Sequence, residues 1–147
     1  MSVKPIFFAL DGPNLSEFEF MLKKLEGHIF GVKVGLEMFI SEGPKIVEKL
    51  KKDEWTVFLD LKLHDIPNTV KKATESANNL GADFLTIHIA SGKDALQEAS
   101  SSKNDSFQGR TKGIYLSWGQ LFYISYIRHS NESHFTSLVR TMISIIT

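Results

Sequence analysis

The chain has 147 residues, with 17 basic and 17 acidic side chains and no cysteine. The balanced charge gives no electrostatic reason to expect a nucleic acid or an anionic membrane as a partner, and the lack of cysteine excludes disulfides, thiolate metal sites and a cysteine nucleophile. No apolar run approaches the roughly 20 residues of a membrane helix, and the N-terminus lacks the features of a signal peptide, so we expect a cytoplasmic protein.

Four short apolar segments predict β-strands, and each delivers a polar residue near its end. The segments are residues 5–10, 30–35, 56–62 and 84–88, with Asp11, Lys33, Asp60 and His88 as the polar residues. Apolar residues recur at helical spacing over 18–25, 39–50 (interrupted at Gly43 and Pro44) and 70–80, and residues 92–99 predict a further short helix. Ser16 and Asp65 are candidate N-caps of the first and third of these helices.

The repeat of strand, loop and helix predicts an α/β fold of the TIM (β/α)8-barrel family, of which this chain supplies about the first four βα units. A complete barrel needs eight such units and usually about 250 residues. Parallel strands of this kind present their ligand sites at their C-terminal ends, where the four polar residues lie.

The composition changes near residue 105. All three arginines and all three tyrosines lie beyond it, whereas 16 of the 17 acidic residues lie at or before it. We therefore divide the chain into 1–105, the N-terminal half of a βα-barrel domain, and 106–147, an atypical tail. Residues 112–117 could form a fifth strand and residues 135–146 a helix or a strand, and the cations of the tail are too scattered for a nucleic-acid-binding arm.

A predicted strand end carries two carboxylates and a lysine within six consecutive positions: Asp60, Lys62 and Asp65. Asp60 and Lys62 share one face of that strand, and Lys33 and Asp11 lie at the same rim. Neighbouring carboxylates hold a lysine protonated, ready to donate a proton to a carbanion, and they repel a substrate carboxylate. The combination favours decarboxylation with proton replacement. The alternative is an ion-pair network that closes the barrel mouth; His88 could be a ligand contact or a hydrogen-bonded structural histidine.

The stretch 58–70 resembles the signature of the orotidine 5′-phosphate decarboxylase family around its Asp-x-Lys-x-x-Asp core. The continuation Ile66-Pro67-Asn68-Thr69-Val70 separates it from sugar-phosphate relatives that share only this core. Residues 9–11, 32–37 and 81–88 support the resemblance, which runs over about residues 5–99.

This resemblance implies decarboxylation of orotidine monophosphate to uridine monophosphate in de novo pyrimidine biosynthesis, without a metal or an organic cofactor. Lys62 would protonate C6 of the pyrimidine, Asp60 would crowd the departing carboxylate, and Asp11 and Lys33 would bind the ribose hydroxyls. The family forms homodimers that share their sites, so Asp65, Ile66 and Thr69 would enter the partner's pocket. His88 is assigned to substrate binding.

The sequence lacks the family's pyrimidine-contacting Thr-Ser segment and its phosphate-binding glycine and arginine. We hypothesise a change of reading frame near residue 105, which would leave a truncated enzyme with activity far below that of an intact one. A second interpretation is an inactive half-barrel that only self-associates through its sheet edges. A metal-dependent sugar-phosphate lyase on the same barrel is a third, disfavoured by the continuation 66–69.

Overall fold

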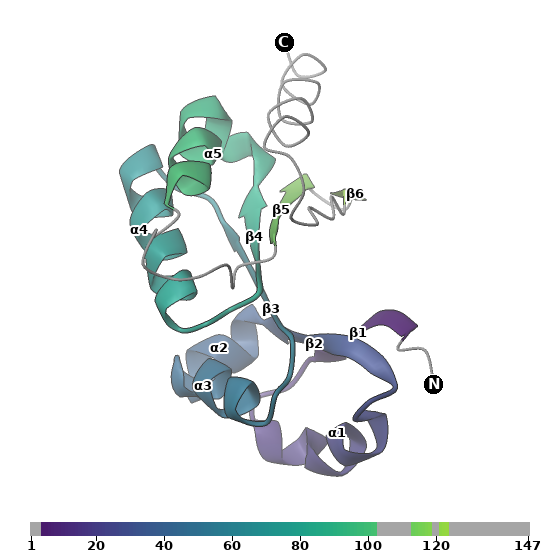
Figure 1. Cartoon of the computed structure of the whole chain (residues 1–147). Coiled ribbons are helices and arrows are strands. Elements are labelled where there is room, and N and C mark those ends of the chain that lie inside the picture. The colour runs from purple at the N-terminus through teal and green to yellow at the C-terminus, as the bar shows by residue number, and fades with distance from the viewer. Residues whose placement is uncertain (1–3, 103–112, 119–120, 124–147) are drawn as a thin grey trace.

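The computed structural model describes residues 4–102, 113–118 and 121–123 (Figure 1). Its strands are β1 (Lys4–Leu10), β2 (Ile29–Gly35), β3 (Val57–Leu63), β4 (Phe84–His88), β5 (Gly113–Trp118) and β6 (Leu121–Tyr123). Its α-helices are α1 (Glu19–Leu25), α2 (Leu36–Glu42), α3 (Lys45–Lys52), α4 (Pro67–Asn79) and α5 (Gly92–Ser101), and the 3-10 turns η1 (Leu15–Phe18) and η2 (Ile89–Ser91) precede α1 and α5.

The strands form one sheet in the order β1-β2-β3-β4-β5-β6. The first five strands are parallel, and β6 returns antiparallel to β5. The four predicted strands and the suggested fifth strand are therefore confirmed, as is the α/β class. The predicted boundary at residue 105 and the predicted element at 135–146 lie outside the described residues.

The two faces of the sheet carry different side chains because successive residues of a strand point to opposite sides. In Figure 1, α2, α3, α4 and α5 lie to the left of the strands. The face toward the helices is apolar, and its fully buried residues include Val32, Val34, Leu59, Leu85 and Ile87. On the helices they pack with Met38, Val47, Leu50 and Ala77 in one cluster and with Val70 and Ala95 in a second.

Four phenylalanine rings gather at the N-terminal part of the sheet. Phe7 packs edge-on against Phe30, Phe58 and Phe84, with ring centroids 5.3–5.4 Å apart. Phe84 is completely buried. These rings form an apolar floor, and the polar residues of the same strands lie beyond it toward the C-terminal ends.

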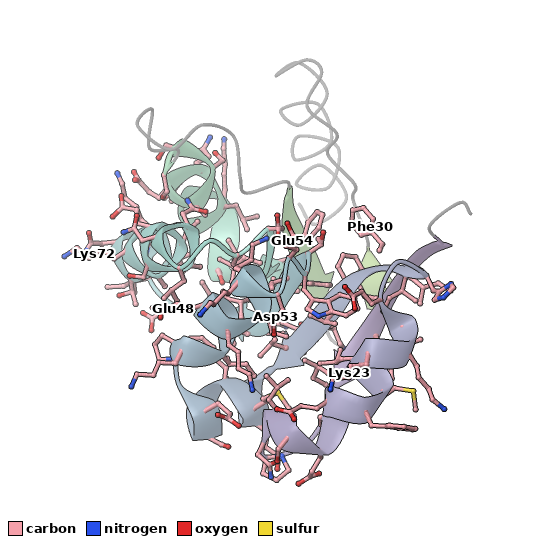
Figure 2. All side chains as sticks on the ribbon, turned by 60° about the horizontal axis from the view of Figure 1, so that its bottom comes forward. Lys23, Phe30, Glu48, Asp53, Glu54 and Lys72 are labelled. Atoms are coloured by element: carbon pink, nitrogen blue, oxygen red, sulfur yellow. The ribbon has the colours of Figure 1, made fainter. Side chains whose placement is uncertain are left out.

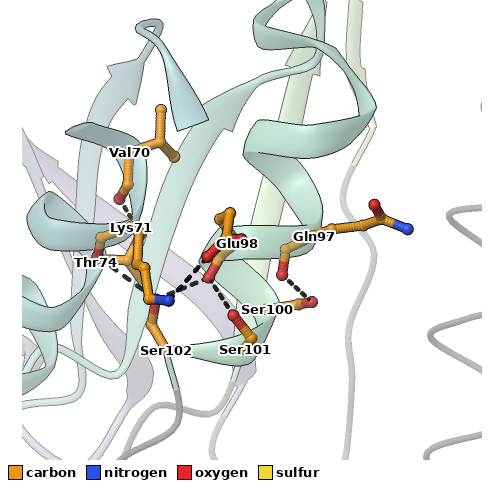
Figure 3. A network of polar contacts seen from close by, with 8 residues as sticks. All are labelled: Val70, Lys71, Thr74, Gln97, Glu98, Ser100, Ser101 and Ser102. Atoms are coloured by element: carbon orange, nitrogen blue, oxygen red, sulfur yellow. Dashed lines mark hydrogen bonds and ion pairs between the residues drawn. The ribbon is translucent and has the colours of Figure 1, made fainter. Parts of the chain in front are cut away.

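Polar contacts away from the sheet hold α4 and α5 side by side. Lys71 Nζ of α4 lies 2.8 Å from Glu98 Oε2 of α5, an ion pair that is drawn in Figure 3. The hydroxyl of Ser102 donates to the Glu98 carbonyl, and Ser102 is nearly buried. The Glu98 carboxylate raises the pKa of the Lys71 ammonium through its hydrogen bond and charge. The charged residues labelled in Figure 2 (Lys23, Glu48, Asp53, Glu54, Lys72) are exposed.

Both predicted N-caps are wrong. Asn14, and not Ser16, caps the first helical turn, because its side-chain oxygen accepts the amide hydrogen of Glu17; Ser16 donates its hydroxyl to the same oxygen. Ile66 occupies the N-cap position of α4, and Pro67 begins the helix without a side-chain cap. The break at Gly43, which has φ 70°, is confirmed as the boundary between α2 and α3. No helix among the described residues is both long and apolar enough to cross a membrane.

Candidate active site

Asp60 is the centre of a cluster of charges at the C-terminal end of β3. Its side chain is 5% exposed, and its Oδ2 atom lies 2.9 Å from Lys62 Nζ and 3.3 Å from Lys33 Nζ. Its other oxygen, Oδ1, accepts a hydrogen bond of 3.0 Å from the hydroxyl of Thr86 on β4. Every oxygen of this buried carboxylate therefore has a partner, as a buried charge requires.

The partners keep the carboxylate of Asp60 ionised. Burial by itself raises the pKa, but the hydrogen bond and the charge of Lys62 oppose it, together with the Thr86 hydrogen bond and the charge of Lys33. The net result is a pKa below the ordinary value of 3.8. The site therefore holds an ionised carboxylate between the side chains of Lys33 and Lys62.

Glycines on β2 make room for this cluster. Gly35 pairs in register with Asp60, so the β2 position directly opposite Asp60 carries no side chain. A Cβ atom at Gly35 would lie 3.3 Å from Asp11 Oδ1, which places the Asp11 carboxylate against the end of β2. Gly31 is needed for another reason: a Cβ there would lie 2.3 Å from the carbonyl oxygen of Thr56.

Lys62 lies where the pairing of β3 with β4 is irregular. The register advances by four residues on β3, from Leu59 to Leu63, and by two on β4, from Leu85 to Ile87. Lys62 itself has φ 50°, in the left-handed region that side chains rarely adopt, and its amide donates to Thr86 Oγ1 at 2.8 Å. Its side chain is 43% exposed, so the ammonium has Asp60 on one side and remains accessible to a substrate.

The structure thus brings together three of the predicted residues, Lys33, Asp60 and Lys62. The prediction that Asp60 and Lys62 share a face is confirmed by their ion pair. Asp11 is exposed and forms no ion pair with any described residue, although it lies close to Gly35.

The residues predicted to serve a partner lie at the start of α4, apart from this cluster. Asp65 is exposed, and its Oδ1 accepts from the amide of Ile66 at 2.7 Å. Ile66 is 66% exposed and Thr69 is exposed as well. No described residue forms an ion pair with Asp65, so its contribution to a second subunit stays a prediction.

His88 makes a local structural contact. Its Nδ1 atom accepts from the amide of Ala90 at 3.2 Å, which caps η2, and its ring stacks on His64 with centroids 4.8 Å apart. The hydrogen-bonded structural role is therefore present, and a contact with substrate stays a prediction. The stacking partner, His64, is itself exposed.

Sequence reasoning missed Thr86 as a site residue. Strand alternation places it on the same face as Phe84, but its contact with Lys62 depends on the irregular pairing of β3, which has no signal in the sequence. Among the described residues there is no group of three or more histidine or acidic side chains that could hold a metal ion.

Comparison with known proteins identifies the same family over most of the chain. The family model of the "Orotidine 5'-phosphate decarboxylase / HUMPS family" matches residues 4–138. Orotidine 5′-phosphate decarboxylase of Listeria monocytogenes serotype 4a is 50% identical over 96 residues, which are 65% of this chain and 41% of that protein. The enzyme of the same name from Halalkalibacterium halodurans is 46% identical over 97 residues, or 66% and 41% of the two chains.

Two solved structures share the fold. The crystal structure of orotidine 5′-phosphate decarboxylase from Lactobacillus acidophilus has a TM-score of 0.61 and 37% identity, covering 67% of this chain and 45% of that one. An uncharacterized conserved protein from Geobacillus kaustophilus gives a TM-score of 0.67 and 34% identity, covering 90% and 59%. The fold is that of a TIM barrel, covered in part, and the chain spans about two fifths of the length of the curated relatives it matches.

Proposed function

Because this chain belongs to the orotidine 5′-phosphate decarboxylase / HUMPS family, we propose that it carries the proton-donating half of a decarboxylase site and converts orotidine monophosphate to uridine monophosphate. The observation that carries this proposal is the buried carboxylate of Asp60 between the ammonium groups of Lys33 and Lys62. It is the arrangement that the sequence predicts for decarboxylation with proton replacement.

The geometry gives each charge a role. A substrate carboxylate beside Asp60 is repelled by it, and this repulsion is relieved as carbon dioxide leaves. The bond between C6 and the carboxylate breaks, its electron pair stays on C6, and Lys62 Nζ donates a proton there. Lys33, 3.3 Å from the same oxygen of Asp60, completes the charged array and binds the ribose together with Asp11. These steps use side chains alone, and the reaction takes place in cytoplasmic pyrimidine biosynthesis.

Turnover is tested by following the loss of orotidine monophosphate absorbance with the purified chain. We expect a rate far below that of the longer relatives, because the sequence lacks the family's phosphate-binding glycine and arginine. Such contacts, remote from the reacting carbon, supply binding energy that is used in the transition state. The Lys62→Ala variant should abolish the rate, whereas Lys72→Ala, which removes an exposed lysine of α4, should not change it. A rate that survives Lys62→Ala contradicts the proposed proton donor, and no rate above the uncatalysed background contradicts the proposed activity.

A homodimer with shared sites is the second part of the proposal. It is supported by the exposure of Ile66 and Thr69 next to Asp65, since an apolar side chain that is 66% exposed is suited to a subunit contact. Light scattering measures the assembly. Mixing Lys62→Ala with Asp65→Ala chains tests the sharing: with random pairing, half of the dimers keep one intact site, so about a quarter of the activity returns. No recovery in the mixture contradicts a shared site.

The edge of the sheet supports a different candidate, a chain that only self-associates. β1 is the outermost strand and pairs with β2 alone among the described residues, and Ile6 on it is 49% exposed. Unpaired strand edges recruit other strands. Scattering that shows concentration-dependent growth beyond a dimer, in a chain without turnover, would favour this candidate.

A further inference from the structure

We propose that Thr86 is a positioning residue, whose hydroxyl fixes both the carboxylate of Asp60 and the backbone of Lys62 and so aims the Lys62 ammonium. This inference rests on the proposed function for the role of Lys62. Its contacts and its first test do not depend on turnover.

The first step is the direction of the hydrogen bonds. A threonine hydroxyl has one hydrogen to donate and accepts through its lone pairs. Thr86 Oγ1 accepts the amide hydrogen of Lys62 at 2.8 Å, so its own hydrogen is free to bond Asp60 Oδ1 at 3.0 Å. Both contacts are satisfied by one orientation of the hydroxyl, and Thr86 is only 3% exposed, so water does not replace it easily.

The second step concerns the carboxylate of Asp60. Its two oxygens have separate partners, with Thr86 on Oδ1 and the ammonium groups of Lys33 and Lys62 on Oδ2. A partial rotation of the carboxylate about its last bond would move one oxygen away from the Thr86 hydroxyl and the other away from the lysines. The hydroxyl therefore selects the orientation in which one oxygen faces both lysines.

The third step concerns the backbone of Lys62. Its φ of 50° is unfavourable for a residue with a side chain, so neighbouring groups must hold it. The Thr86 hydroxyl is the acceptor for the amide of this strained residue, at the irregular pairing of β3 with β4. Because the side chain of Lys62 starts from this backbone, the same bond sets the direction of its ammonium.

The test compares Thr86→Val, which keeps the shape and removes the hydroxyl, with Thr86→Ser, which keeps the hydroxyl. Thr74→Val is the matched control, since Thr74 is also buried and its hydroxyl donates only to the carbonyl of Val70 in its own helix. Carbon-13 NMR of the Asp60 carboxyl group should show a higher pKa in Thr86→Val, and an unchanged pKa in Thr86→Ser and Thr74→Val.

A second readout uses the unmodified chain and so does not depend on how the variants fold. The Lys62 amide should exchange slowly with solvent although the residue is exposed, because it is bonded to a buried hydroxyl. If turnover is measurable, Thr86→Val should lower kcat about 100-fold with little change in KM. Fast exchange of the Lys62 amide, or an unchanged Asp60 pKa in a folded Thr86→Val chain, overturns the inference. If the unmodified chain shows no turnover, the proposed function is overturned instead.

Discussion

The ion pair between Lys51 of α3 and Asp83 before β4 should be a main contributor to the stability of this sheet. Asp83 Oδ2 lies 2.5 Å from Lys51 Nζ and also accepts the amide hydrogen of Val57 at 2.9 Å. Lys51 donates further to the carbonyl of Trp55 at 3.0 Å. One pair thus connects the end of α3, the start of β3 and the start of β4.

The cost of removing Lys51 follows from the burial of its partner. The Asp83 side chain is 5% exposed, so Lys51→Ala removes the cation that is paired with a buried carboxylate. Breaking a buried pair in this way costs about 3–5 kcal/mol, and the partial exposure of Lys51, 25%, reduces this to about 2–3 kcal/mol. In the Asp83→Asn background no buried charge is left behind, so the same Lys51→Ala change should cost only about 1 kcal/mol or less.

Urea unfolding monitored by circular dichroism measures this cost. The matched control is Lys49→Ala on the same helix, whose pair with Glu19 at 3.1 Å is more than half exposed on both sides and should contribute about 0.5 kcal/mol or less. Lys51→Ala should lower the unfolding midpoint by about 1–2 M urea and Lys49→Ala hardly at all. Equal midpoints for the two variants would refute the reasoning from burial.

Three further predictions concern the stability contributed by the phenylalanine rings, the need for glycine at position 31, and the loss of stability at acid pH. Phe84→Ala should cost about 3–5 kcal/mol because it empties the centre of the buried ring cluster, whereas Phe20→Ala, at a side chain 69% exposed, should stay within about 0.5 kcal/mol; equal losses in urea unfolding would contradict this. Gly31→Ala should cost about 1–3 kcal/mol, more than Gly35→Ala, because its Cβ meets the backbone carbonyl of Thr56 and not a movable side chain. The lowered pKa of Asp60 contributes stability that is present above pH 3.8 and lost as the pH falls through the folded-state pKa, so Asp60→Asn should flatten the acid part of the stability curve; an unchanged acid slope would show that another carboxylate governs it.

The strands and the rim residues could be predicted from the sequence because their signal is local. Alternation along residues 56–62 places Asp60 and Lys62 on one face, and the ion pair between them confirms it. The caps could not be predicted as well. Ser16 and Asn14 are both good capping residues, and the choice depends on where the first helical turn begins: the turn starts at Leu15, so the Glu17 amide hydrogen is donated to Asn14.

The sequence by itself determined the charge cluster on which the proposed function rests. Its members are Lys33, Asp60 and Lys62 at strand ends, and the family signature surrounds them. Local periodicity and residue chemistry are sufficient for this, because parallel strands bring their C-terminal ends to one edge. Only the tertiary structure decided how the cluster is held. The irregular pairing of β3 with β4 places the Thr86 hydroxyl between Asp60 and the Lys62 amide. Such a contact depends on the register of two strands, because Lys62 and Thr86 are 24 residues apart in the sequence.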